Sequence, residues 1–180
     1  MINLIEANEK YLEGYKEAYI ETKKKIEEGH LKKHNMLFIN PEEVDIIQHY
    51  KDNRDVSKLP KQYVPSYDYF FVEEDKFIGI VHIRIRLTEN LLRYGGHIGY
   101  AINPKYWNQG YGTKLLQAAI NNYKNIIEED KILITSDDDN IASCKIIEAN
   151  GGVLENIIEN KDCEETFLTR RYWIKKEEKK

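Results

Sequence analysis

The sequence has no hydrophobic run approaching the roughly 20 residues that a membrane-spanning helix requires. It has only two cysteines, Cys144 and Cys163, which lie far apart and outside any metal-ligand spacing. No basic stretch followed by an apolar run opens the chain, so no secretory signal is expected. These absences predict a cytoplasmic protein with reduced thiols, no metal site and no membrane contact.

An excess of basic residues is also missing. The formal net charge of -4 gives no electrostatic footprint for nucleic acid, so a phosphate-bearing ligand would need a local site built from backbone amides. Hydrophobic residues make up 41% and charged residues 32%, which is typical of a folded globular protein and excludes a disordered one. A length of 180 residues suits a single domain.

The N-terminal third predicts a strand and a pair of helices. Ile2–Ile5 is short and apolar, as an edge strand would be. Residues 8–28 place tyrosines and an isoleucine at approximately helical spacing among lysines and glutamates. Pro41 followed by Glu42 and Glu43 favours the first turn of a second helix, which we expect to continue through Tyr50.

After Pro60 and Pro65 the hydrophobic period changes to two. The later pattern predicts strands at 69–72, 77–87, 97–102 and 131–135, helices at 111–123 and 141–148, and a terminal hairpin of strands at 153–158 and 166–174. This order predicts an α+β domain with one central twisted sheet, mixed but mostly antiparallel, flanked by helices. We divide it into an N-terminal part (1–67), a core (68–174) and a solvated tail beginning at residue 175.

The most informative stretch runs from a strand that ends at Asn103-Pro104 to a helix that Gly110 and Gly112 open. Backbone N–H groups at a helix start lack partners and point outward with the positive end of the dipole, which favours an anion. Two glycines without Cβ atoms would let a pyrophosphate approach the main chain. The structural alternative is a simple turn before a helix. A P-loop is excluded because no Gly-Lys-Ser/Thr follows.

This strand, Asn103-Pro104, loop, Gly-x-Gly and amphipathic helix together resemble the acetyl-CoA motif of the GNAT acetyltransferases. The resemblance extends from about residue 69 to 174 and includes Asn140 and Ser143, which hold the places of residues at or near the pantetheine arm. It implies a GNAT-like domain over 1–180 and an enzyme that moves an acetyl group from acetyl-CoA to a primary amine. The amine would belong to a small molecule or a peptide and attack directly in a ternary complex. The resemblance also allows a homodimer.

The resemblance also implies which residues hold the donor. The main chain around Tyr100 to Ile102 would pair with the pantetheine amides, and an N–H of Ala101 or Ile102 would polarise the thioester carbonyl. The pyrophosphate would be held by Asn108, Gln109, Gly110, Tyr111, Gly112 and Thr113. The family often has Arg or Gln three residues before the first motif glycine, where this chain has Trp107.

Proton transfer is assigned to His97 and Tyr100. Histidine ordinarily titrates near neutral pH, which makes His97 the candidate base, with hydrogen bonding inside the sheet as its structural alternative. Tyr100 is the candidate acid, because the family's usual tyrosine, seven residues after Asn140, is replaced by Ile147. Arg84 and Arg86 could bind an anionic acceptor or pair with neighbouring acids. The carboxylates that could face the acceptor are Glu73, Glu89 and Asp137.

Two other hypotheses compete with an enzyme. The missing tyrosine at Ile147 gives weight to a non-catalytic module that binds or senses acyl-CoA. A nucleotide-binding protein could use the Gly110-Tyr111-Gly112 turn for a different phosphate. The acidic run from Asp137 to Asp139 suggests a metal, but a solvated loop that caps the next helix explains it better.

Overall fold

The computed structural model describes residues 1–161 and 166–176, so Cys163 and the end of the expected tail lie outside the described residues. The strands are β1 (Ile2–Ile5), β2 (Ser66–Glu73), β3 (Lys76–Arg84), β4 (Ile98–Ile102), β5 (Lys131–Asp137), β6 (Val153–Asn160) and β7 (Phe167–Lys175). The main helices are α1 (Leu12–Glu27), α2 (Ile46–Asp52), α3 (Tyr111–Tyr123) and α4 (Ile141–Ala149).

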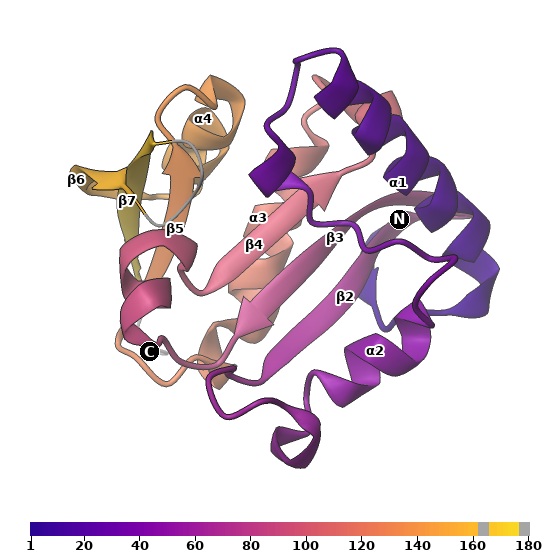
Figure 1. The fold of residues 1–180 in the computed structure, drawn as a ribbon, viewed down its shortest axis with the longest axis horizontal. Coiled ribbons are helices and arrows are strands. Elements are labelled where there is room, and N and C mark those ends of the chain that lie inside the picture. Colours follow the sequence, from indigo (N-terminus) through magenta and orange to yellow (C-terminus); the bar gives the residue numbers. More distant parts are fainter. Residues whose placement is uncertain (162–165, 177–180) are drawn as a thin grey trace.

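The strands form two antiparallel sheets, which confirms the α+β class. One sheet has the order β1-β2-β3-β4 and the other the order β5-β7-β6 (Figure 1). The prediction was of one continuous sheet. The ladder is interrupted between β4 and β5, where the His97 N–H donates to the Leu133 carbonyl at 2.8 Å and the two strands then diverge. Gly96 allows this approach, because a Cβ there would lie 2.7 Å from the Leu133 oxygen.

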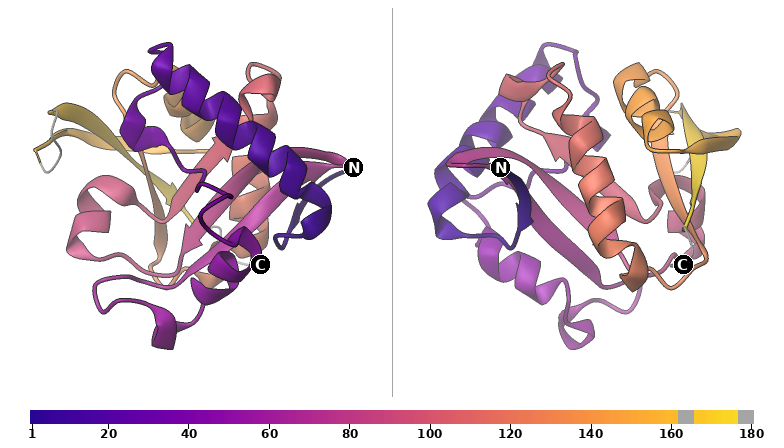
Figure 2. Two further views of the ribbon diagram at one scale, coloured as in Figure 1. Left: turned by 45° about the vertical axis from the view of Figure 1, so that its right-hand side comes forward. Right: turned by 180° about the vertical axis from the view of Figure 1, so that it is seen from behind.

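Helices cover both faces of the four-stranded sheet (Figure 2). On the face below α1 and α2, aromatic side chains of the sheet pack against Tyr15, which stacks on Phe70 at 5.6 Å between ring centroids. The tyrosines of the predicted N-terminal helix are therefore largely core residues, as their spacing indicates. The buried aromatic face fixes α1 above the sheet.

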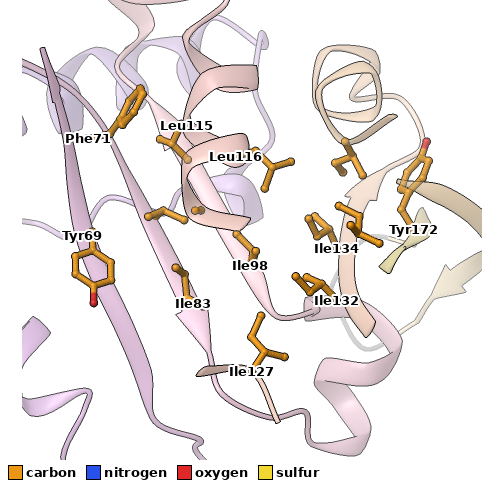
Figure 3. Close-up of a cluster of buried hydrophobic side chains, with 14 of the residues drawn as sticks. Tyr69, Phe71, Ile83, Ile98, Leu115, Leu116, Ile127, Ile132, Ile134 and Tyr172 are labelled. Atoms are coloured by element: carbon orange, nitrogen blue, oxygen red, sulfur yellow. The ribbon is translucent and has the colours of Figure 1, made fainter. Parts of the chain in front are cut away.

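The opposite face packs on α3, and the same core continues into the second sheet. Ile83 and Ile98 from the first sheet meet Leu116 from α3 and Ile132 and Ile134 from β5 (Figure 3). These side chains are buried, and burial of a side chain of this size stabilises the fold by about 1.5–3 kcal/mol. The apolar core therefore holds the two sheets together where backbone pairing does not.

Local sequence signals placed most elements but misplaced one helix start. Helix α3 has the predicted bounds, whereas α2 begins at Ile46 and not at Pro41. The prediction of helix from Pro41 is wrong, because residues 41–44 form turns and the Asp45 side chain caps α2 by accepting from the Gln48 N–H at 3.0 Å. Strand β3 also ends earlier than predicted, at Arg84.

Candidate active site

A cavity of about 710 Å³ occupies the gap between the diverging strands and continues to the start of α3. Its walls come from β4, the end of β5, the first turn of α4, the start of α3 and the connection between α1 and α2. All the predicted site residues except His97 and Gln109 line it, namely Tyr100, Ala101, Ile102, Asn108, Gly110, Tyr111, Gly112, Thr113, Asn140 and Ser143. Segments separated by most of the chain thus meet at one concave site.

The edge of β4 that faces the cavity has free backbone groups. The His97 carbonyl accepts from β3 and the Asn103 N–H donates to β3, both at 2.8 Å. Since N–H groups alternate in direction along an antiparallel strand, the intervening register turns the N–H of Ala101 toward β3. The N–H groups of Tyr100 and Ile102 face the cavity instead. An extended ligand could add to this edge as a further strand.

Trp107 closes one end of that edge. Its indole Nε1 donates to the Ile102 carbonyl at 2.9 Å, and its ring lines the cavity. Trp107 therefore fixes the loop between β4 and α3. It supplies no charge to an anionic ligand but sets the path of the chain into the helix.

Glycine is required at Gly110 and at Gly112 for different structural reasons. Gly110 has a φ of +78°, the left-handed region that favours glycine, and an added Cβ would meet nothing within 4 Å. An added Cβ at Gly112 would lie 2.5 Å from Cδ1 of Ile146, so this glycine lets α3 pack closely on α4. The missing side chain of Gly112 therefore makes room for Ile146, while the residue also lines the cavity.

The start of α3 presents unpaired amides. The Lys114 N–H donates to the Gly110 carbonyl at 3.3 Å, which leaves the N–H groups of Tyr111, Gly112 and Thr113 without a partner in the helix. These groups and the helix dipole favour an anion at the end of the cavity. Tyr111 contributes its backbone here, because its hydroxyl donates to Glu73 at 2.5 Å.

His97 lies outside the cavity lining and is fully buried. Its Nδ1 accepts from the Leu133 N–H at 2.9 Å, and its Nε2 lies 2.9 Å from Oε2 of Glu129. Burial lowers the pKa of His97, although the Glu129 carboxylate acts in the opposite direction. These contacts favour the structural alternative, in which the ring joins the two sheets at the point where they diverge.

Tyr100 reaches into the cavity toward α4. Its hydroxyl lies 3.1 Å from Oγ of Ser143, whose N–H is capped by the Asn140 side chain at 3.1 Å. Burial raises the pKa of Tyr100 and outweighs the hydrogen bond with Ser143, so the phenol keeps its proton. Ile147 is fully buried in the core, so its position does not face the cavity, whereas Ile146 does.

The end of the cavity beside β5 contains a pair of residues in contact, of which the sequence indicated only one. Asp137 was one of three carboxylates considered, and it lines the cavity while Glu73 and Glu89 do not. Its partner is His34, whose Nε2 lies 2.7 Å from Oδ2 of Asp137, and Asn35 donates to the same oxygen at 2.9 Å. No local signal identifies His34, because it lies 103 residues from Asp137 in the chain.

The two arginines of β3 and the loop after it have separate environments. Arg84 lines the cavity, but its Nη1 donates to the carbonyls of Gly95 and Gly96 at 3.4 and 3.2 Å, and burial lowers its pKa. Arg86 lies 4.0 Å from Glu128 in a surface ion pair. Arg84 therefore holds the loop before β4 and contributes positive charge to the wall.

Within residues 1–161 and 166–176, no group of three or more His, Cys, Asp or Glu side chains is arranged to hold a metal ion. No helix in the same part of the chain combines the length and the apolarity needed to cross a membrane.

The family follows from a sequence comparison. Residues 32–153 match the model of the acetyltransferase (GNAT) domain, a span that includes β2 to β5, α2 to α4 and the whole loop from β4 to α3. The chain belongs to the GNAT acetyltransferase family. No curated protein matches the chain significantly.

Solved structures of acetyltransferases share the fold. One is the microcin C7 self-immunity acetyltransferase MccE in complex with acetyl-CoA and AMP, with 18% identity, a TM-score of 0.69 and coverage of 97% of this chain and 92% of that one. Another is the Salmonella typhimurium acetyltransferase that modifies the N-terminal serine of ribosomal protein L7/L12, with 17% identity, a TM-score of 0.70 and coverage of 98% and 95%. At these identities the likeness shows the fold alone.

Proposed function

We propose that this protein is an acetyl-CoA-dependent N-acetyltransferase that acetylates a primary amine of a small molecule or a peptide. The observation that carries the proposal is the single cavity that follows the open edge of β4 and ends at the unpaired amides of α3. An acyl-CoA has an extended amide-bearing arm and a pyrophosphate, and these two features of the cavity fit those two parts of the molecule.

Two groups of backbone amides in the site correspond to two parts of the donor molecule. The N–H groups of Tyr100 and Ile102 lie on the cavity side of β4, where the pantetheine amides can pair with them. The amides of Tyr111, Gly112 and Thr113 would hold the pyrophosphate, helped by the left-handed turn at Gly110. MccE, which shares this fold and whose structure contains acetyl-CoA, supports acetyl-CoA as the donor.

The chemistry follows from the same edge. The donor supplies an acetyl group activated as a thioester. A backbone N–H at a fixed position beside the carbonyl stabilises the charge that develops on its oxygen, and the N–H of Tyr100 or Ile102 would provide it. The pairing of Ala101 toward β3 makes it the weaker candidate for this role. The protonated phenol of Tyr100, beside Ser143, is the candidate donor of a proton to the departing sulfur.

The acceptor would enter between the α1–α2 connection and the end of β5. Both acceptor classes named above remain in the proposal, and the fold neighbour that modifies an N-terminal serine supports testing peptides. The panel should therefore contain small primary amines together with short peptides that have a free α-amino group.

Calorimetric titration with acetyl-CoA, with ATP as the control ligand, tests the donor site, and thiol release in the presence of the amine panel tests turnover. We expect saturable binding of acetyl-CoA alone and thiol release that depends on an amine. Binding without thiol release from any amine would favour an acyl-CoA-sensing module. Equal binding of ATP would favour the nucleotide hypothesis, and no binding of acetyl-CoA would overturn the proposal.

A further inference from the structure

The connection between α1 and α2 lines the cavity and is joined to the end of β5 by two side-chain contacts. A one-turn helix, Lys33–Asn35, places two side chains on the same carboxylate oxygen. Nε2 of His34 lies 2.7 Å from Oδ2 of Asp137, and Nδ2 of Asn35 lies 2.9 Å from it. The Asp137 side chain is only 7% exposed, so this carboxylate is buried and meets two partners.

The His34 ring is held on its flat face as well as at its edge. It stacks on Phe167 from β7 with 4.1 Å between ring centroids and 10° between the planes. The ring still lines the cavity, and the side chain is 33% exposed. His34 is therefore a fixed imidazole with one side open to the site.

The contact with Asp137 determines which nitrogen of the His34 ring can accept a proton. An ionised carboxylate only accepts hydrogen bonds, so the proton of a neutral His34 ring must lie on Nε2, toward Asp137. Nδ1 then has a free lone pair. Within the described residues, Nε2 is the only nitrogen of this ring with a hydrogen-bonding partner. A buried carboxylate behind an imidazole fixes the orientation of the ring and the nitrogen that carries its proton, which is the arrangement of a general base.

His30, the other histidine that lines the cavity, is less suited to act as a base than His34. His30 also lines the cavity, but its side chain is 63% exposed and its acidic neighbour, Glu28, is 3.7 Å away at the surface. The charged groups around His34 are Asp137 from β5, Lys32 on its own segment, and Asp139, with which Lys32 pairs at 2.8 Å. Among the residues that the structure describes, Asp137 is the charged group in direct contact with the His34 ring.

We propose that His34 is the general base for the acceptor amine and that Asp137 positions it; this rests on the proposed acetyltransferase function. The acceptor nitrogen forms a bond to the acetyl carbon, and the carbon–sulfur bond breaks with its electron pair remaining on sulfur. The proton that the nitrogen loses passes to Nδ1 of His34 and then to water. The sulfur takes a proton from Tyr100, which water restores, so the charges balance over the cycle.

The variants are His34→Gln and, as the matched control, His49→Gln, because His49 lies on α2 outside the cavity lining. Glutamine at position 34 keeps an N–H donor where His34 has Nε2, so the link to Asp137 is kept while the basic nitrogen is removed. We expect acetyl-CoA affinity to change less than about twofold, and kcat/KM for the best amine of the panel to fall about 10²-fold or more. His49→Gln should leave both quantities unchanged.

A second measurement needs no acceptor. Nitrogen NMR of ¹⁵N-histidine-labelled protein, with the His34 signals assigned by their loss in His34→Gln, reports which ring nitrogen carries the proton. We expect a neutral ring protonated at Nε2, and loss of that preference in Asp137→Asn. A proton on Nδ1 of the neutral ring, or an unchanged kcat/KM in a His34→Gln variant that binds acetyl-CoA, overturns this inference alone. Wild-type protein that fails to bind acetyl-CoA overturns the proposed function instead.

Discussion

At the scale of single residues, two glycines that look alike in the sequence do different things. Gly110 turns the chain into α3 through a left-handed conformation with open space around it. Gly112 lies against Ile146 and sets how closely α3 approaches α4. Gly29, after the end of α1, provides a comparison, because it has nearly the same φ (+77°) and the same open surroundings but lies outside the cavity lining.

Gly110→Ala should weaken acetyl-CoA binding about tenfold, whereas Gly29→Ala should not. Both variants force an alanine into the left-handed region and should each lose about 1 kcal/mol of unfolding free energy. Only at Gly110 would relaxation of the strained turn redirect an amide that faces the pyrophosphate, a hydrogen bond to a charged group worth about 1.5 kcal/mol. Denaturant unfolding and calorimetric titration measure the two effects. Equal affinities in the two variants would contradict this role for Gly110.

Only those parts of the site that depend on neighbouring residues in the chain could be predicted from the sequence. The Gly-x-Gly turn and the partner-free amides of α3 are local features, and the motif predicted that part of the cavity. His34 could not be found in this way, because its importance depends on a carboxylate in a distant strand. His97 was predicted as the base because histidine ordinarily titrates near neutral pH and because the residue lies on the strand beside the expected donor. Its burial, which lowers its pKa, depends on the assembled fold and not on the local sequence.

At the scale of elements, the junction of β4 and β5 determines whether a cavity exists. Beyond the backbone bond from His97 to Leu133, the His97 ring adds a second bond to the Leu133 N–H and a contact with Glu129. Past this point the strands separate. The backbone and the ring of His97 therefore link the two sheets, which share no ladder of paired strands.

His97→Ala should lower the free energy of unfolding by about 3 kcal/mol, because it leaves the buried Leu133 N–H without an acceptor and empties the space of the ring. Glu129 is partly exposed, so Glu129→Gln should lower it by less than about 1 kcal/mol. Because the pKa of His97 is lowered in the folded state, its contribution is complete above about pH 6.5 and shrinks as the pH falls. Denaturant titrations at several pH values should show the deficit of His97→Ala narrowing in acid. A deficit independent of pH would contradict this account.

The start of α2 shows why one element was misplaced. Pro41 and its acidic neighbours satisfy the general preferences of a helix start, but Asp45 and Gln48 form the more specific pattern of a capping residue with a partner three positions on. The N–H of Gln48 donates to the Asp45 side chain. Asp45 is therefore the N-cap, and the helix begins at the next residue, Ile46. Helix α3 was predicted with its correct bounds because glycine, apolar period and length all agree there.

At the scale of the whole molecule, the sequence predicted the order of strands and helices but not the division into two sheets. Hydrophobic alternation identifies each strand, and it carries no information on which strands fail to pair. The apolar core under α3 and between the sheets compensates for the missing ladder (Figure 3). The cavity is thus a property of the assembled fold, opened by the divergence of β4 and β5 and closed at its base by packed side chains.

A donor bound in this cavity would bridge both sheets and both neighbouring helices, so binding should stabilise the molecule as a unit. At a concentration of about 100 times Kd, acetyl-CoA should raise the free energy of unfolding by about 2.7 kcal/mol, which raises the Tm by several degrees. Hydrogen exchange should slow most at Tyr100 and Ile102 and at residues 111–113, where the proposed contacts lie. The edge strand β1 and helix α2 lie outside the cavity lining and should gain only the global protection. ATP at the same concentration is the control and should change neither quantity. Protection that is absent from β4 and the start of α3, despite a raised Tm, would place the donor elsewhere on the molecule.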